Sequence, residues 1–257
     1  MRAKCAYYWQ KMRLTYLSHF ITRQSNLLEK IRKNTCKLED FVYTSLGITP
    51  YDKYKGHDEK TIKKRIFHSP LKLDNTYVPL ISGKNIHPFY VSNEIDEYLK
   101  YGNWLGAPRE KRFFENHKII IRQILAGEQQ RIIAAYSEEP YYFTQIGFSL
   151  ISKNNDSTML KYLTCLLNST LMSFYHRNVF LDLEKTVFQK ILIANAKKLP
   201  IKDINDKSTF ISFFNNANNL NMKKLDLLVY HLYNLNYDEV LIIDPKTSIT
   251  REEYEQK

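Results

Sequence analysis

The sequence has few of the residues that build disulfide frameworks, cofactor loops or membrane spans. Its three cysteines (Cys5, Cys36 and Cys165) are odd in number, widely spaced and without a CxxC or Cys/His pair. This pattern argues against a disulfide framework or a structural zinc site and fits a reducing cytoplasm. Seven scattered glycines form neither GxGxxG nor GxxxxGK[ST], so no nucleotide-binding loop is expected. No apolar run approaches 18 residues, and we expect no membrane span or secretion signal.

Catalytic motifs are equally scarce. The chain has no Asn-Pro-Pro-Tyr or Asp-Pro-Pro-Tyr tetrapeptide, and its seven histidines show no HxH or HxxxH spacing. Asp58-Glu59-Lys60 and Asp244-Pro245-Lys246 match half of a nuclease motif, a pattern short enough to arise by chance. The nearest upstream acid, Asp52, lies in a lysine-rich stretch. We therefore expect no catalysis, metal or cofactor in this chain.

Positive charge is concentrated in the first half of the 257-residue chain, which has a net charge of +11. Residues 1–34 contain eight basic side chains and one acid, Glu29. Residues 35–131 have a net charge of +4, and residues 132–257 have none. This distribution favours a polyanionic partner such as nucleic acid. A solvated surface that only keeps the protein soluble remains the alternative.

Residues 1–34 are expected to form one basic helix. A seven-residue rhythm of apolar side chains defines its seam, which consists of Leu14, Leu17, Ile21, Leu28 and Ile31. Because the segment has one acid and eight bases, pairing between two copies of this helix would bring like charges together. We therefore expect the apolar seam to pack against another domain or another protein. An isolated chain could still dimerise through it. We expect this helix to be loosely attached.

The rest of the chain predicts an α+β fold, with a β-rich middle and a helical end. Strands are expected at 77–81, 117–125, 129–136 and 141–152, the second and third forming a hairpin across residues 126–128. The isoleucines of 117–125 leave neither face polar, which predicts a buried central strand. Helices are expected after caps at Asp156 or Ser157, Ser208 and Asn221. The first is expected to be a single helix with apolar side chains at helical spacing, Leu160, Leu163, Leu167, Leu171 and Phe174. The predicted units are a connector at 1–36, a core domain at 37–205 and a packed helical segment at 206–257.

Several polar segments have the residue types that contact DNA. Lysines suit phosphates, whereas Arg, Asn and Gln can pair with base edges. For the lysine-rich loop Lys53–Arg65, a solvated surface and a phosphate-binding surface are equal alternatives. For Arg122, a buried ion pair with a carboxylate is at least as compatible with the sequence as a base contact. Trp104 is expected to be a core anchor. The candidate DNA contacts are Tyr51, Lys53, Lys55, Lys63, Lys64, Lys84, Asn85, Arg109, Arg112, Gln123, Gln129, Gln130 and Arg131.

Motifs along residues 37–243 resemble a known family in the right order. They are Gly47-Ile48-Thr49-Pro50-Tyr51, Pro79–Ile86, Tyr101–Leu105 with Pro108-Arg109, Lys118–Ile124, Leu167-Asn168-Ser169, Leu199-Pro200-Ile201 and Val229–Leu235. This series is similar to the TaqI-like C-terminal specificity domain of type IIG restriction–modification enzymes and adenine-specific DNA methyltransferases.

The resemblance implies a bacterial, cytoplasmic target recognition domain that binds a short double-stranded DNA sequence. It also implies a methyltransferase or endonuclease catalytic domain, in cis or in trans, which would hold S-adenosylmethionine. The alternative is a protein-interaction module of a larger complex that makes no contact with DNA.

Overall fold

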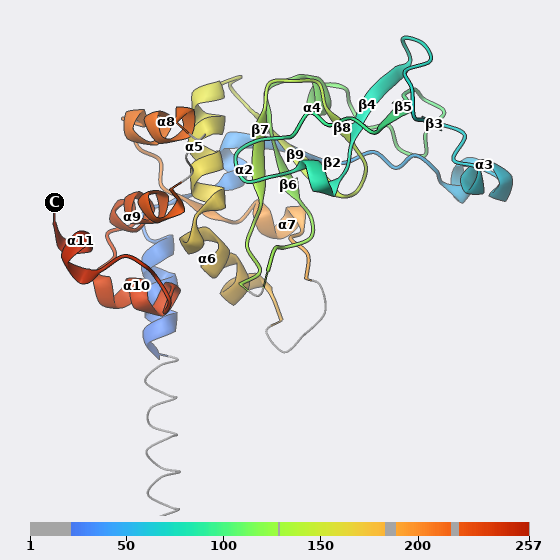
Figure 1. The fold of residues 1–257 in the computed structure, drawn as a ribbon. Helices are drawn as coiled ribbons and strands as arrows, with labels where there is room; N and C mark the ends of the chain where they lie inside the picture. Colours follow the sequence, from blue (N-terminus) through green and yellow to red (C-terminus); the bar gives the residue numbers. More distant parts are fainter. Residues whose placement is uncertain (1–21, 128, 183–188, 217–220, 257) are drawn as a thin grey trace, which may run out of the picture.

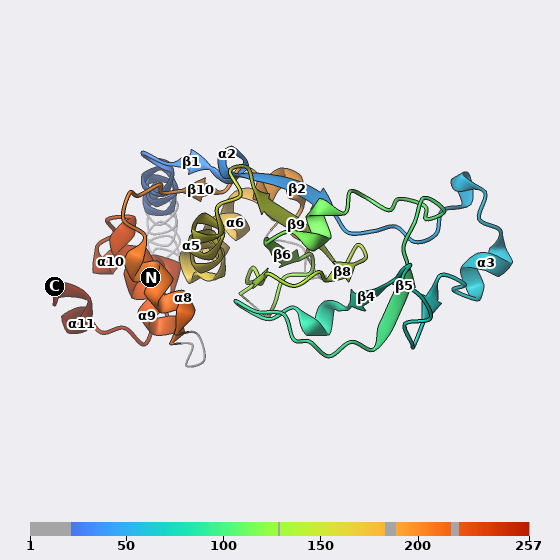
Figure 2. The same cartoon turned by 90° about the horizontal axis from the view of Figure 1, so that it is seen from above.

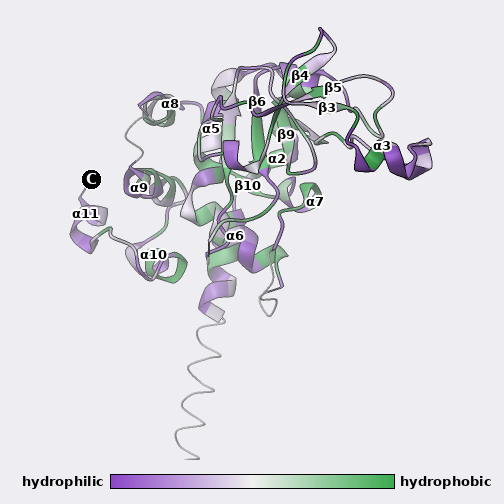
Figure 3. Cartoon of the chain, turned by 45° about the vertical axis from the view of Figure 1, so that its right-hand side comes forward, coloured by the Kyte–Doolittle hydropathy of each residue, from purple (hydrophilic) through white to green (hydrophobic). Residues whose placement is uncertain are grey.

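The computed structural model describes residues 22–127, 129–182, 189–216 and 221–256. The fold is mixed α+β, as predicted, with two four-stranded sheets and helices that gather at the C-terminal side (Figure 1). Hydrophobic residues are most concentrated in the central strands, as Figure 3 shows. None of the described helices is long and apolar enough to cross a membrane.

The larger sheet is antiparallel and has the order β2-β9-β6-β7. Its strands are β2 (Val42–Leu46), β6 (Lys118–Arg122), β7 (Ala134–Ser137) and β9 (Gly147–Ser152). Ile119 and Ile121 of β6 enter one apolar core while Ile120 enters a second core on the opposite face. All three are fully buried, so the predicted buried central strand and the β6–β7 hairpin are confirmed.

Two consecutive helices, α5 (Ser157–Asn168) and α6 (Thr170–Phe180), pack in the first core. Asp156 caps α5 as predicted, through a hydrogen bond from the Met159 N–H. The single helix expected from the apolar spacing is broken at Ser169, which takes an extended conformation and caps α6. The break lets both helices bury apolar faces while changing direction.

The smaller sheet has the order β3-β5-β4-β8. It consists of β3 (His68–Ser69), β4 (Tyr77–Ile81), β5 (Glu97–Lys100) and β8 (Tyr142–Phe143). The predicted strand at 77–81 is confirmed, whereas the one expected at 141–152 is two strands, β8 and β9, in different sheets. Gly47 packs against the segment that links β8 to β9. A Cβ at this position would be 1.9 Å from the Thr144 carbonyl oxygen, so only glycine fits.

The short elements β1 (Cys36–Lys37) and β10 (Pro200–Ile201) pair with each other. Helix α2 (Leu38–Phe41) directly follows β1, α4 (Arg112–Glu115) contacts β9, and α7 (Ile193–Ala196) contacts α6. The C-terminal helices are α8 (Ser208–Asn215), α9 (Met222–Leu232), α10 (Tyr237–Ile243) and α11 (Arg251–Glu255). Asn221 caps α9 as predicted, but Ser208 is the first residue of α8, whose cap position is Lys207.

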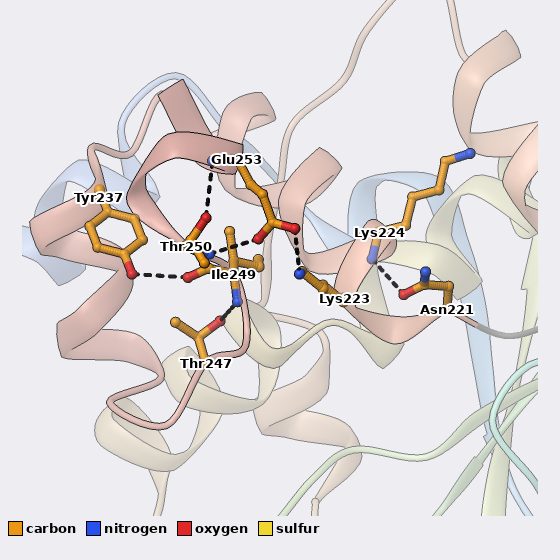
Figure 4. A network of polar contacts seen from close by, with 8 residues as sticks. All are labelled: Asn221, Lys223, Lys224, Tyr237, Thr247, Ile249, Thr250 and Glu253. Carbon is orange, nitrogen blue, oxygen red and sulfur yellow. Dashed lines mark hydrogen bonds and ion pairs between the residues drawn. The ribbon is translucent and has the colours of Figure 1, made fainter. Parts of the chain in front are cut away.

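The last helix is tied to α9 by a polar network, seen in Figure 4. Glu253 accepts from the Thr250 N–H at 2.8 Å and pairs with Lys223 Nζ at 2.7 Å. The side chain of the neighbouring Lys224 points away from this network (Figure 4).

The described part of the N-terminal segment is a helix at 22–32 that belongs to the core. Leu27 and Ile31 are buried in the same cluster as α5 and α6. Lys30 pairs with Glu239 of α10 at 2.6 Å, and Gln24 donates to Asn178 of α6 at 2.6 Å. This part of the expected loosely attached helix is therefore firmly packed, because its apolar seam meets the chain's own helices. Leu14, Leu17 and Ile21 lie outside the described residues.

Lys118 at the start of β6 is fully buried, with its Nζ donating to the carbonyl oxygens of Asn116 and Glu139. Desolvation lowers its pKa to about 7. The unfolded chain keeps the ordinary, higher value and so binds the extra proton between these two pKa values. Stability contributed by Lys118 should therefore rise with pH above about 7, at up to about 1.4 kcal/mol per pH unit. Urea unfolding of Lys118→Met from pH 7 to 9 should lack this slope; an unchanged slope would contradict it.

Candidate nucleic-acid interface

Residues 51–76, here called the distal lobe, lie at the opposite end of the molecule from α11 (Figures 1 and 2). The lobe contains a 3-10 turn (Lys53–Lys55), helix α3 (Glu59–Lys63) and β3. Asp52 accepts from the Tyr54 N–H at 2.9 Å, and Asp58 caps α3 through the Thr61 N–H at 2.6 Å. The hydrogen bond to Thr61 lowers the pKa of Asp58. These two carboxylates are turned towards the backbone rather than towards the lysines.

The lysines of the distal lobe are exposed. Lys63 pairs with Glu59 at 2.9 Å, and Arg65 pairs with Glu97 at 2.8 Å. Within the described residues, five further lysines of the lobe have no ion-pair or hydrogen-bond partner for their Nζ atoms: Lys53, Lys55, Lys60, Lys64 and Lys72. Long, unpaired cations on a projecting surface are suited to phosphate contacts. Lys60 and Lys72 were not among the predicted contacts, although the segment's charge already pointed to them.

Tyr51 anchors the base of the distal lobe. Its hydroxyl accepts from the Phe67 N–H at 3.0 Å and lies 2.8 Å from His68 Nδ1, while its ring stacks on Phe67 at 5.2 Å. Burial raises the pKa of Tyr51 and lowers that of His68. These contacts give Tyr51 a structural role at the base of the lobe, and its predicted contact with DNA stays a prediction.

The two predicted contacts in the turn after β4, Lys84 and Asn85, have different environments. Lys84 is exposed and pairs with Asp96, which raises the pKa of the lysine. Asn85 is 2% exposed, and its amide nitrogen donates to Ser92 Oγ and the Glu94 carbonyl oxygen. Its amide oxygen accepts from the Ser82 N–H at 2.8 Å. The Asn85 amide is fully used within the turn, which gives this residue a structural role and makes it less suited to a base contact than the exposed Lys84.

Arg109 and Arg112 line a surface pocket of about 690 Å³ beside strand β2. The guanidinium of Arg112 lies 5.4 Å from the ring of the exposed Tyr43 and pairs with Glu110 at 2.8 Å. Lys153 lies 5.7 Å from the same ring. The pocket combines these cations with two carboxylates, Glu39 and Glu110. It brings two predicted contacts together, but Arg112 already has an acidic partner.

The turn of the β6–β7 hairpin contains three predicted contacts, Gln129, Gln130 and Arg131. A fourth, Gln123, directly follows β6, and its N–H donates to the Ile146 carbonyl oxygen at 2.8 Å. The Arg131 N–H donates to the Ala126 carbonyl oxygen at 2.8 Å. Arg131 Nη2 donates to the Asn168 carbonyl oxygen at 3.4 Å and to Thr170 Oγ1 at 3.3 Å, fixing the turn to the start of α6. Gln129 is exposed, while Gln130 is half-buried with φ 51°. The glutamines therefore belong to the turn and not, as predicted, to the following strand.

The predicted contacts therefore lie in separate regions rather than on one patch. Arg112 precedes β6 and Gln123 follows it, so they lie at opposite ends of that strand. The lobe lysines form a further region (Figure 2). Trp104, expected as a core anchor, is 42% exposed and closes a loop by donating to the Lys100 carbonyl oxygen at 3.0 Å. Arg122 meets no carboxylate among the described residues; its Nε donates to the Ile124 carbonyl oxygen at 3.1 Å.

Residues 78–201 match the model of the TaqI-like C-terminal specificity domain and belong to that family. The match runs from β4 to β10 and is narrower than the predicted 37–243. It includes the hairpin, Arg109 and Arg112, and it leaves the distal lobe and the β2 side of the Arg109 pocket outside.

Known proteins resemble the chain at low identity. A Methanocaldococcus jannaschii protein with the name of a type II restriction enzyme and methyltransferase, RM.MjaORFECS2P, is 24% identical over 181 residues, which are 68% of this chain and 14% of that protein. The type IIG restriction endonuclease BpuSI has the same fold over 90% of this chain and 34% of its own, with a TM-score of 0.54 and 10% identity. A type I restriction–modification S subunit from M. genitalium aligns over 89% of this chain and 58% of its own, with a TM-score of 0.37 and 11% identity. The chain thus spans a small part of the first two proteins.

Proposed function

We propose that this chain is the sequence-specific DNA-binding target recognition domain of a type II, IIG-like restriction–modification adenine-N6 methyltransferase. The observation that carries the proposal is the set of five exposed, unpaired lysines on a lobe joined to a specificity domain. A duplex carries one phosphate charge per ~1.7 Å of its length, and such lysines bind it by releasing counterions.

Two regions have different roles in this proposal. The distal lobe positions the duplex, because flexible lysine side chains contact phosphates of any sequence. The turn of the β6–β7 hairpin reads bases, because it is fixed to a buried strand and to α6 through Arg131. A rigid support holds an amide or guanidinium in the geometry that a base edge requires. Gln129 and Gln130 are the candidate readers, with Arg131 as their support.

Catalysis is assigned to a separate domain, in cis or in trans. That domain would hold S-adenosylmethionine and perform methyl transfer or cleavage once the duplex is positioned. Within the described residues, no group of three or more His, Cys, Asp or Glu side chains could hold a metal ion.

The proposal is tested by selecting duplexes from a random pool with the purified full chain at about 50 mM salt. We expect a short consensus sequence to be enriched, and binding to weaken steeply as the salt concentration increases. Enrichment without a consensus would show non-specific binding and contradict the proposed reading. Absence of DNA binding at low salt would favour the protein-interaction alternative.

A further inference from the structure

The connection between β3 and β4, residues 70–76, exposes two leucines on the distal lobe. Leu71 is 67% exposed and Leu73 is 64% exposed, with the unpaired Lys72 between them. Two further apolar side chains of the lobe face solvent, Tyr54 at 100% and Ile66 at 49%. Single exposed leucines are common on protein surfaces, but two that are about two-thirds exposed and only two residues apart on one projecting connection mark a candidate interaction site.

Local hydrogen bonds hold this connection at both ends. The Leu71 N–H donates to Ser69 Oγ at 3.1 Å, directly after β3. Before β4, Asp74 Oδ1 accepts from the Thr76 N–H at 2.7 Å, and the Tyr77 N–H donates to the Asp74 carbonyl oxygen at 3.2 Å. Pro70 further limits the backbone. The leucines are thus presented on a fixed turn rather than on a flexible tether.

The charges around the leucines define the partner's chemistry. The same lobe presents unpaired lysines, and its acids Asp52, Asp58 and Asp74 accept hydrogen bonds from nearby backbone N–H groups. A surface that is both cationic and apolar fits a polyanion with apolar surface between its charges. Duplex DNA has this chemistry, because stacked bases lie between two rows of phosphates.

We propose that Leu71 and Leu73 form an apolar wedge that enters the groove of the bound duplex and partly unstacks one base step. This inference rests on the proposed function. Apolar wedges beside cationic side chains separate base pairs and bend DNA, and the bend brings more protein surface into contact with it. Flexible pyrimidine–purine steps yield most easily, so the wedge would add sequence preference without a hydrogen bond to any base.

The wedge is tested with the full chain and duplexes that contain 2-aminopurine at successive adenines of the selected consensus. Binding should raise 2-aminopurine fluorescence at one step at least about twofold. The double variant Leu71→Ala/Leu73→Ala should lose this rise while keeping the salt dependence of binding, because all lysines remain. The control Leu192→Ala/Leu241→Ala removes two exposed leucines outside the lobe and should leave the rise intact. Thermal unfolding of both variants checks that the fold is retained.

Each other outcome overturns the wedge in a distinct way. Tight binding without a fluorescence rise, or an equal rise with the Leu71/Leu73 variant, would refute it and leave DNA recognition standing. If neither the unmodified chain nor its variants bind DNA, the proposed function fails as well. Binding to phosphatidylserine vesicles that depends on Leu71 and Leu73, without effect on DNA, would assign the leucines to a lipid surface instead.

Discussion

Replacing Asn168 by alanine is expected to lower the free energy of unfolding by about 2 kcal/mol or more. Asn168 is 2% exposed at the end of α5. Its amide oxygen accepts from the Ala134 N–H at 3.1 Å, and its amide nitrogen donates to the Ala134 carbonyl oxygen at 2.7 Å. The residue thus binds both backbone groups of one position in β7. The Ala134 carbonyl oxygen would keep its hydrogen bond from the Phe89 N–H at 2.9 Å. Alanine would leave the buried Ala134 N–H unpaired, at about 1–3 kcal/mol, and would also remove the second bond to the carbonyl oxygen.

Asn178 provides a matched control for this prediction. Both asparagines donate to the carbonyl oxygen four residues earlier in their helix, Thr164 for Asn168 and Phe174 for Asn178. Only Asn168 also bonds to the sheet. Asn178→Ala should therefore cost less than about 1 kcal/mol. Urea unfolding of both variants measures the difference; equal losses would mean that the contact with β7 contributes little.

Asn168 also shows what the sequence could predict. Leu167-Asn168-Ser169 was identified by its resemblance to a family motif, and the structure supplies the physical reason: Asn168 holds β7 and Ser169 caps α6. The Leu199-Pro200-Ile201 motif has a similar explanation, because Tyr233 Oη donates to the Pro200 carbonyl oxygen at 2.7 Å. Both motifs stabilise the fold. Resemblance therefore located the core well without locating DNA contacts.

Other features of the fold depend on contacts between distant segments. Periodicity predicted the buried strand β6, because its isoleucines face two cores. It could not reveal that residues 141–152 divide between two sheets, since the division depends on β8 pairing with β4. Nor could it show that Leu27 and Ile31 pack against the chain's own helices, because an apolar seam does not identify its partner.

The candidate site was predicted unevenly for the same reason. The net charge of residues 53–72 correctly marked a projecting cationic surface, because charge is a property of composition. The sequence could not show that Asn85 and Tyr51 make structural hydrogen bonds, because the residue type alone does not reveal whether an amide or a hydroxyl already has partners. Only their hydrogen bonds, to Glu94 and Phe67 among others, show that they are occupied.

Replacing Lys53, Lys55 and Lys64 together by alanine is expected to weaken DNA binding by roughly 10²–10³-fold at about 0.1 M salt. Each of these lysines is exposed and without a partner among the described residues. Each can therefore bind a phosphate without breaking an existing ion pair. The slope of log affinity against log salt concentration should fall by about one unit per lysine. Because phosphates carry no sequence information, the selected consensus and random duplexes should be affected alike.

The matched control removes the same charge outside the distal lobe. Lys198, Lys224 and Lys246 are exposed, and Lys224 projects away from its neighbours in Figure 4. If overall charge drove association, the triple variant Lys198→Ala/Lys224→Ala/Lys246→Ala would weaken binding as much as the lobe variant. If the lobe contacts the backbone, the control should change the salt slope by less than about one unit, since contacts and not remote charges release counterions. Salt titrations of both variants on one duplex separate the two cases. If the two variants had equal salt slopes, the phosphate contacts would not lie on the distal lobe. If the lobe variant no longer distinguished the consensus from random duplexes, its lysines would contribute to sequence recognition.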